Sequence, residues 1–274
     1  MSWGIESVTV RYGSQVALDG LTLQPERGSV TVVIGGDGAG KSTCLKALVG
    51  LVPLNEGTAS RPSKKEIGYV PATGGVYPDL TVYENLAFFG RSYGMKGSAF
   101  EKRRANVMEL VGLRDVRDRL AGQLSGGTQR KLAVGLALLH QPLLLVLDEP
   151  TTGLDPLSRA ELWRVISHTA AQGAAVVLST TYVNEAQRAS LVILLSEGRS
   201  IAAGSPSQII AGVPGKVGTI KSERQPPGLA WRRGGMWHTW DHSKGTPDEA
   251  DRIELDFNDA VIIAELSHEI GITR

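Results

Sequence analysis

The segment Gly35–Thr43 (GGDGAGKST) combines glycines, one lysine and two hydroxyl side chains at a spacing that suits phosphate binding. An apolar run (VTVVI) precedes it, and a helical pattern beginning near Lys41 follows. Gly35 and Gly40 let consecutive N–H groups point at an anion, and the helix N-terminus adds positive potential. Lys41 can reach the β- and γ-phosphates, and the Ser42 hydroxyl can ligate Mg²⁺. We therefore expect a nucleotide phosphate site formed by Gly35, Gly36, Asp37, Gly38, Ala39, Gly40, Lys41, Ser42 and Thr43.

A pair of carboxylates follows the apolar run LLLVL at Asp148 and Glu149. A buried strand ending here would place Asp148 at the carboxyl edge of a sheet, where it can hold Mg²⁺ directly or through water. Glu149 could polarise a water for in-line attack on a γ-phosphate. The alternative, a solvated acidic pair at a strand end, does not explain the phosphate loop upstream.

The composition narrows the class of protein. The 274 residues include 29 basic and 28 acidic side chains, so no strong electrostatic surface for nucleic acid is expected. The single cysteine, Cys44, excludes an internal disulfide, and no apolar run is long enough to span a membrane. The N-terminus has no apolar signal-peptide core. We expect a cytoplasmic chain whose membrane role would depend on a partner.

Hydrophobic periodicity predicts an α/β fold with a largely parallel central sheet, because strands and helices alternate around the phosphate loop. The expected domain covers 1–212, with N-terminal antiparallel strands and a helical insertion at about 80–140. Composition changes after Gly212: residues 213–245 hold three of the five tryptophans, and 246–274 are acidic. We expect 213–274 to form a small α+β appendage. The expected strands are 3–11, 20–33, 67–71, 143–147, 174–179 and 190–195, and the expected helices are 41–51, 81–94, 99–112, 129–140, one from 156 and one at 258–269.

Two further motifs are LSGGT at 124–128 and TTGLD at 151–155. With GGDGAGKST and LDEP in this order, they make residues 1–212 resemble the ATP-binding-cassette (ABC) ATPases; LSGGT alone could be a helix N-cap. The resemblance implies a head-to-tail dimer with two ATP molecules at its interface. It implies that Ser125 and Gly127 bind the γ-phosphate of the partner's nucleotide and that Asp155 lies at the interface. It also implies adenine stacking on Tyr12, although this ring could instead pack on the core. Cys44, in the first turn of the expected helix, could have a lowered pKa or fill the core.

The sequence departs from the family at three positions. The segment IGYVPA ends in Ala72 where the family has the Gln of the Q-loop, and STTYVNEA has Thr181 where a His reaches the γ-phosphate. Asp37 replaces a common Asn. Ala72 and Thr181 cannot supply the missing contacts. We therefore expect slow hydrolysis in the chain's own site, where Glu149, Lys41 and Thr181 are the catalytic positions and Ser42 and Asp148 the metal ligands.

The segments LTVYENLAFFGRSYGM, STTYVNEAQR and LDFNDAVIIAEL most resemble ATPases of ABC-2-type exporters. The resemblance implies separate transmembrane permease subunits that dock near the Q-loop and hold the chain at the inner face of the cell membrane. It also implies a second ABC ATPase chain as partner, more in keeping with a heterodimer than a homodimer. Two alternatives remain: a regulatory subunit that does not hydrolyse ATP, and an ABC ATPase outside transport. The second is disfavoured because the chain has no coiled-coil insertion and only one cassette.

Overall fold

The computed structural model describes residues 3–226, 228–241 and 251–271. The chain forms two compact units, Met1–Ser200 and Ile201–Arg274, and each is described by itself. None of the described helices is long and apolar enough to cross a bilayer.

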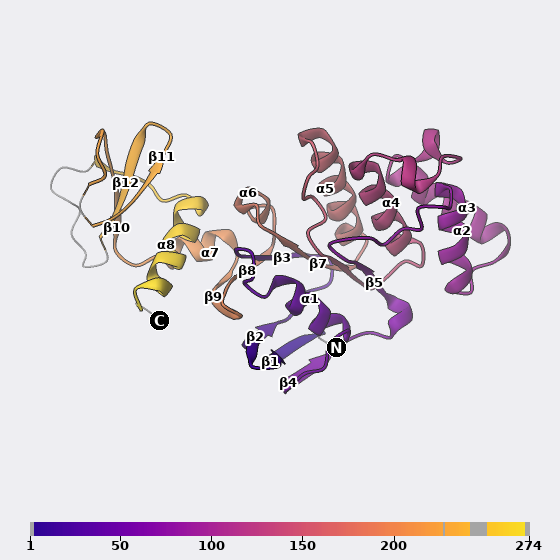
Figure 1. The fold of residues 1–274 in the computed structure, drawn as a ribbon, viewed down its shortest axis with the longest axis horizontal. Helices are drawn as coiled ribbons and strands as arrows, with labels where there is room; N and C mark the ends of the chain where they lie inside the picture. The colour runs from indigo at the N-terminus through magenta and orange to yellow at the C-terminus, as the bar shows by residue number, and fades with distance from the viewer. Residues whose placement is uncertain (1–2, 227, 242–250, 272–274) are drawn as a thin grey trace. The chain divides into compact units, whose positions relative to one another are not determined.

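The centre of the first unit is a six-stranded sheet with the order β5-β6-β7-β3-β8-β9 (Figure 1). Its strands are β3 (Val30–Ile34), β5 (Ile67–Val70), β6 (Leu144–Leu147), β7 (Ala175–Thr180), β8 (Leu191–Ser196) and β9 (Arg199–Gly204). The four pairs from β5 to β8 are parallel, and every residue of β3, β6 and β7 is buried. Continuous apolar runs suit this position because helices cover both faces of a parallel sheet.

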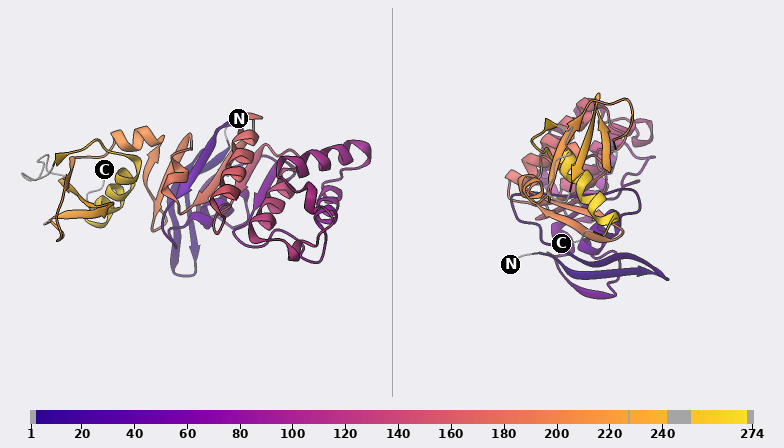
Figure 2. Two further views of the ribbon diagram at one scale, coloured as in Figure 1. Left: turned by 90° about the horizontal axis from the view of Figure 1, so that it is seen from above. Right: turned by 90° about the vertical axis from the view of Figure 1, so that its left-hand side faces the viewer.

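Those covering elements lie on opposite faces of the sheet. Helix α1 (Lys41–Val49) lies on one face and α5 (Pro156–Ala171) on the other (Figures 1 and 2). Beyond α1 is an antiparallel sheet of order β2-β1-β4, made of β1 (Gly4–Tyr12), β2 (Gln15–Leu23) and β4 (Glu56–Ser60). Side chains of both sheets and of α1 share one hydrophobic core. The predicted α/β fold with N-terminal antiparallel strands is therefore confirmed.

The prediction of a single strand over residues 20–33 is wrong. β2 ends at Leu23 and β3 begins at Val30, and the two strands belong to different sheets. The intervening QPERGS contains a proline and Gly28, whose φ of 77° marks a turn. The apolar residues on both sides hid this break from a periodicity argument.

A helical region lies between β5 and β6 in the sequence. It contains α2 (Val82–Ser92), α3 (Gly97–Leu110) and α4 (Gly126–Leu138), with short 3₁₀ helices at Lys64–Glu66, Arg114–Val116 and Ala121–Gln123. Helix α2 starts at a capping box in which Thr81 and Glu84 exchange hydrogen bonds. Helix α4 begins before the predicted Gln129, so LSGGT includes its N-cap and first turn.

The second unit contains helices α7 (Pro206–Ala211) and α8 (Phe257–Glu269), which pack together, and an antiparallel sheet of order β11-β12-β10-β13. The strands are β10 (Lys216–Ile220), β11 (Leu229–Arg233), β12 (Met236–Asp241) and β13 (Asp251–Arg252). Val217, Trp240 and Ile263 form its core. The unit begins before the boundary expected at Gly212, and the functional division of the chain stays a prediction. Residues 242–250 and 272–274 of the predicted appendage lie outside the described residues.

One buried carboxylate joins the sheet and helix α8 of this unit. Asp259, which is 1% exposed, accepts hydrogen bonds from Nε1 of Trp231 at 3.1 Å and from Nη1 of Arg233 at 3.3 Å. Nδ1 of His238 lies 3.1 Å from its Oδ1. The Asp256 carboxylate caps α8 by accepting a bond from the Asp259 N–H at 3.0 Å.

We expect Cys44 to resist alkylation in the folded chain. The thiol is completely buried in α1, and burial, with a smaller effect of Asp148, raises its pKa to about 12. The thiol therefore stays protonated at pH values well below 12, and the thiolate is the reactive species. Iodoacetamide labelling followed by mass spectrometry at about pH 8 should modify Cys44 at least tenfold more slowly in native than in denatured chain. Equal rates would contradict this account.

Candidate active site

The phosphate-loop sequence lies between β3 and α1, where the close approach of neighbouring backbone requires glycine. A Cβ on Gly35 would lie 2.3 Å from the Leu195 carbonyl oxygen, and one on Gly40 would lie 2.6 Å from that of Ala17. Gly40 also has a φ of 103° at the N-cap of α1, and Gly38 has a φ of 82°. These conformations favour glycine strongly. The backbone therefore takes the strand–loop–helix course that the sequence predicted.

The Lys41 ammonium group lies inside this loop. Its side chain is 5% exposed, and Nζ donates hydrogen bonds to the carbonyl oxygens of Gly35 and Gly36, both at 3.0 Å. Oε1 of Glu149 lies 3.4 Å from Nζ, whereas Oδ1 of the exposed Asp37 lies 3.9 Å away. The structure thus brings together the lysine predicted to bind phosphate and the carboxylate predicted to activate the attacking water.

The two carboxylates follow β6 at the carboxyl edge of the sheet. Asp148 is 1% exposed, and its Oδ1 accepts a hydrogen bond of 2.6 Å from the Ser179 hydroxyl. Glu149 has a φ of 46°, unusual for a residue other than glycine, and its N–H donates to the same Ser179 oxygen at 2.9 Å. Thr152 donates to Oε2 of Glu149 at 3.3 Å. Ser179 therefore positions both acidic residues.

Ser179 is a residue that sequence reasoning missed as part of the site. It lies near the end of β7, between β6 and β3, and the register pairs Val33 with Ser179. Because the carboxyl ends of parallel strands meet at one edge, a hydroxyl at the end of a neighbouring strand is the signal that could have identified it.

The arrangement fits MgATP. The loop glycines leave room for close approach of phosphate, since a Cβ on Gly36 or Gly38 would meet nothing within 4 Å. Ser42 in the first turn of α1 and the buried Asp148 offer the hard oxygen ligands that Mg²⁺ prefers. The positive end of α1 and the Lys41 ammonium supply the positive potential that a triphosphate needs.

The LSGGT and TTGLD motifs each cap a helix, and both caps are exposed. Ser125 accepts a hydrogen bond from the Thr128 N–H at 3.3 Å at the start of α4. Asp155 accepts hydrogen bonds from the N–H groups of Leu157 and Ser158, both at 3.0 Å, at the start of α5. Hydrogen bonds from Ser158 lower the Asp155 pKa. A Cβ on Gly127 would lie 3.4 Å from the Leu154 side chain, so the two motifs are neighbours.

The structure leaves the Tyr12 ring accessible. Tyr12 ends β1 and is 50% exposed, so the alternative of an aromatic buried in the core does not hold. An exposed ring is available for stacking, and adenine stacking stays a prediction.

Two of the three departures from the family pattern, Ala72 and Thr181, come shortly after β5 and β7. Ala72 follows β5, and its carbonyl oxygen accepts a hydrogen bond from Arg130. Thr181 follows β7 and is exposed. Neither residue has a side chain long enough to replace a glutamine amide or an imidazole.

The segment after Thr181 is anchored by Glu185, a second residue that the sequence analysis missed. Glu185 is 2% exposed and accepts hydrogen bonds from the Thr151 and Thr180 hydroxyls at 2.8 and 2.7 Å. Nε of Arg159 lies 3.6 Å from its Oε1. This group joins the TTGLD segment to the segment that follows β7.

A glycine-rich phosphate loop, two carboxylates at a strand end and an LSGGT helix cap define a P-loop ATP-binding cassette. Residues 18–152 match the family model described as "ABC transporter". The Nod factor export ATP-binding protein I of Ralstonia nicotianae is 35% identical over 75% of this chain and 68% of its own length. The probable multidrug ABC transporter ATP-binding protein YbhF of Escherichia coli K12 is 37% identical over 69% of this chain, but over only 34% of its own length.

The solved structures agree with the sequence comparisons. A structure described as the ATP-binding subunit of an ABC transporter has a TM-score of 0.71 and 27% identity, covering 77% of this chain and 92% of its own. The chain belongs to the ATP-binding proteins of ABC transporters, a family of ATP-hydrolysing transporter subunits.

Proposed function

We propose that the chain is the ATP-binding subunit of an ABC-type membrane exporter and binds MgATP at a head-to-tail dimer interface. The observation that carries this proposal is the grouping of Lys41, Asp148 and Glu149 at one sheet edge, in a chain that also exposes an LSGGT helix cap. Export is supported by the names of the Nod factor and multidrug relatives. A location at the inner face of the cell membrane would follow from binding to permease subunits.

The geometry of the site suggests a role for each of these residues. Backbone N–H groups of the loop and the Lys41 ammonium would bind the β- and γ-phosphates, and Ser42 and Asp148 would hold Mg²⁺. The metal ion would neutralise charge that develops on the phosphate oxygens. Glu149 accepts a proton from an attacking water, and its orientation is maintained by the Ser179 contact to its N–H.

The partner would contribute its own signature motif. Ser125 and Gly127 lie at the N-terminal end of α4, where the exposed Ser125 hydroxyl and the N-terminus of the helix would form a second anion site. The side-chain hydrogen bonds of Ser125 are local to α4, and its exposed hydroxyl would be available to the γ-phosphate of another cassette. We propose a second ABC ATPase as partner, and a heterodimer accounts best for a chain with a weakened site and an intact signature motif.

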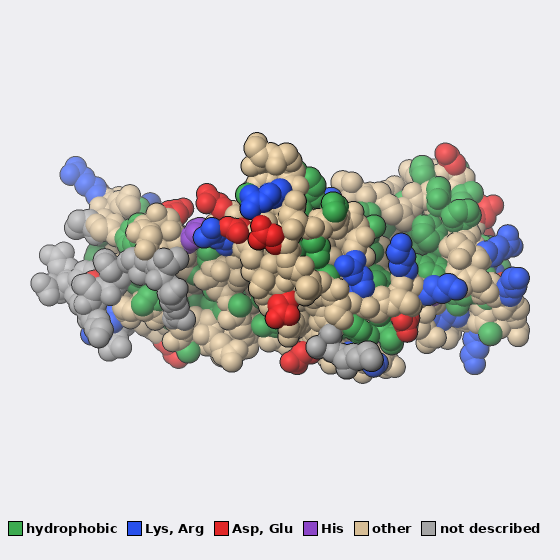
Figure 3. Space-filling view, turned by 90° about the horizontal axis from the view of Figure 1, so that it is seen from below, with side chains coloured by type: hydrophobic (Ala, Val, Ile, Leu, Met, Phe, Trp, Pro, Cys, Tyr) green, Lys and Arg blue, Asp and Glu red, His purple; other side chains and the backbone are tan. Residues whose placement is uncertain are grey.

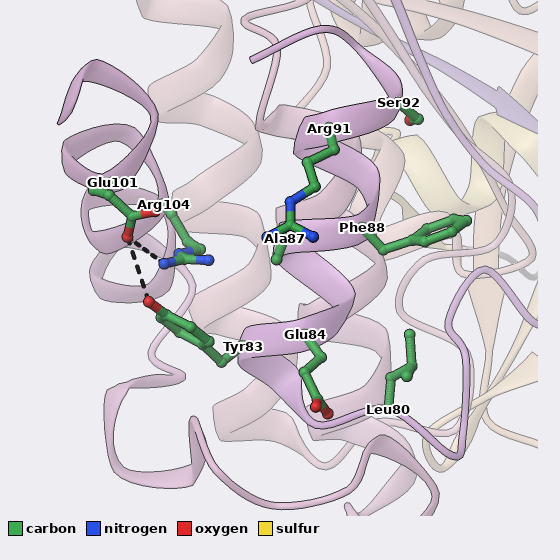
Figure 4. Close-up of a pocket in the computed structure, with 9 residues that line it drawn as sticks. All are labelled: Leu80, Tyr83, Glu84, Ala87, Phe88, Arg91, Ser92, Glu101 and Arg104. Carbon is green, nitrogen blue, oxygen red and sulfur yellow. Dashed lines mark hydrogen bonds and ion pairs between the residues drawn. The ribbon is translucent and has the colours of Figure 1, made fainter. Parts of the chain in front are cut away.

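A groove between α2 and α3 is the surface that we assign to the permease (Figure 4). It has a volume of about 670 Å³, and Phe88, which is 49% exposed, lies on its wall. The Arg104 guanidinium stacks 3.4 Å from the centroid of the Tyr83 ring and pairs with Glu101. Hydrophobic and basic side chains are intermixed over this helical region in Figure 3. A short amphipathic helix of a permease loop that places an apolar side chain beside Phe88 would match this surface.

The rate of ATP hydrolysis in the chain's own site tests the proposal. The purified chain should bind MgATP but turn it over slowly, because loss of water-positioning groups costs about 100-fold or more. The double substitution Ala72→Gln with Thr181→His should raise steady-state phosphate release about tenfold or more. Adding Glu149→Gln to that double variant should abolish the gain.

Two results would contradict this account. Fast turnover by the unmodified chain, abolished by Glu149→Gln, would show that Ala72 and Thr181 do not weaken the site. Absence of MgATP binding would refute the proposed function itself.

The regulatory alternative is supported by the same two departures from the family pattern, Ala72 and Thr181. In that case ATP would hold the dimer together, and this chain would perform little chemistry. Restored turnover in the Ala72→Gln/Thr181→His variant, with no gain in turnover by the assembled transporter, would favour it.

A further inference from the structure

Arg130 connects three backbone segments of the first unit and belongs to none of the motifs discussed above. It lies on α4, the helix that begins with the signature motif. Its Nη1 donates to the Pro71 carbonyl oxygen at 2.8 Å, and its Nη2 donates to that of Ala72. Nη2 also lies 3.5 Å from the Glu149 carbonyl oxygen, at the limit of hydrogen bonding. One guanidinium thus joins the signature helix to the loops after β5 and β6.

The contacts of Arg130 are unlike those of a surface cation. The side chain is partly buried, and burial lowers its pKa, whereas the charges of Asp148 and Glu149 raise it. Within the described residues its hydrogen bonds go to carbonyl oxygens, and no carboxylate lies within ion-pair distance. Burying a guanidinium costs free energy unless such bonds compensate for lost water. If this side chain only filled space, an apolar residue would do so with a smaller free-energy cost of desolvation.

We propose that Arg130 is a positioning residue that couples the orientation of the signature helix to the backbone of Glu149 and of the Ala72 loop. This inference rests on the proposed function. Because its acceptors are main-chain oxygens, the connection does not depend on the side chain at position 72 and is kept in a chain that has alanine there. A fork of N–H donors can serve several carbonyls at once, which an ammonium group does with less geometric control.

The backbone of Glu149 is one end of this coupling, and the signature helix α4 is the other. Glu149 has a left-handed φ of 46°, a conformation that needs support from its surroundings. Ser179 accepts a hydrogen bond from its N–H at 2.9 Å, and Arg130 approaches its carbonyl oxygen from the opposite end of the residue. Movement of α4 when LSGGT engages a partner's nucleotide would therefore be transmitted to Glu149 through Arg130. Signature motif and carboxylate of one chain would respond together.

The test compares Arg130→Met and Arg130→Lys in the transporter complex purified through a tag on this chain. Methionine keeps an unbranched side chain without charge, and lysine keeps the charge without the fork. We expect Arg130→Met to lower kcat about tenfold or more with KM for MgATP changed less than about twofold, because α4, whose signature motif would complete the partner's site, loses its link to the two loops. Arg130→Lys should recover only part of the loss. The control is Lys131→Met, which removes the neighbouring cation, paired with Glu161 on α5, and should leave kcat within about twofold.

Binding and folding measurements separate the possible failures. MgATP affinity and the thermal unfolding midpoint of the Arg130→Met chain should match those of the unmodified chain. An unchanged kcat would refute the role of Arg130 while leaving the proposed function intact, as long as the unmodified chain binds MgATP. Equal losses of kcat, affinity and midpoint would also refute it, because they would show a purely structural residue.

Discussion

Replacing Lys41 with alanine is expected to raise the Kd of the chain for MgATP about 100-fold, the largest effect on binding of any single change. Lys41 is the cation whose Nζ lies within hydrogen-bond distance of two loop carbonyl oxygens and 3.4 Å from Glu149. Its removal leaves only main-chain N–H groups and the helix dipole to balance the charge of a triphosphate, and charge-assisted bonds to phosphate are about twice as strong as neutral ones. Isothermal titration calorimetry with the full chain measures this change.

Lys46→Ala provides the matched control. Lys46 lies in the last turn of the same helix, five residues after Lys41, and is not part of the phosphate loop. Its loss changes the net charge of the chain equally, so a general electrostatic effect would weaken binding in both variants. Equal affinities of the Lys41→Ala and unmodified chains would refute the phosphate-loop interpretation.

The second large effect is expected from the signature motif of the assembled transporter. Ser125→Arg should lower its ATP turnover about 100-fold, because an arginine side chain would block the partner's γ-phosphate from the exposed cap of α4. Glu149→Gln in this chain should lower turnover by less than about threefold, since the site that lacks a Q-loop Gln and a switch His contributes little. Phosphate release by the purified complex measures both.

The ranking of these two variants is the informative result. A larger loss from Glu149→Gln than from Ser125→Arg would show that the chain's own site carries the turnover, against the proposed division of work. As a control, Ser125→Arg should leave the MgATP affinity of the isolated chain unchanged, because the hydrogen bonds of Ser125 are local to α4.

Local patterns were sufficient to predict the centre of the site. The phosphate loop was predictable because glycine conformations and the Lys-Ser pair are set over a few neighbouring residues. Asp148 and Glu149 were predictable because a wholly apolar run marked β6, and a parallel strand must end at the sheet edge. The parallel sheet followed in the same way from short apolar runs separated by helical periods.

The residues that support this centre could not be predicted in the same way. Ser179, Glu185 and Arg130 act through contacts with residues far away in the sequence, and a serine, a glutamate or an arginine in a helical pattern is unremarkable. The apolar pattern also predicted one continuous strand where the structure has β2 and β3, because the residues on both sides of the turn at Gly28 are apolar. The strands of the second unit contain no recognisable motif. Composition alone located tryptophans in this region, but it could not identify the residues that they contact.

The carboxylate of Asp259 has a practical consequence for anyone trimming the C-terminal region. Cutting before α8 would remove the carboxylate whose Oδ1 accepts from Trp231 and whose Oδ2 accepts from Arg233. Arg233 would keep its ion pair with Asp256, but the partly buried indole would lose its acceptor. Such a shortened chain would expose apolar strands and aggregate for reasons unrelated to regulation. Loss-of-function experiments here are therefore better designed with point changes on the outer surface than with nested truncations.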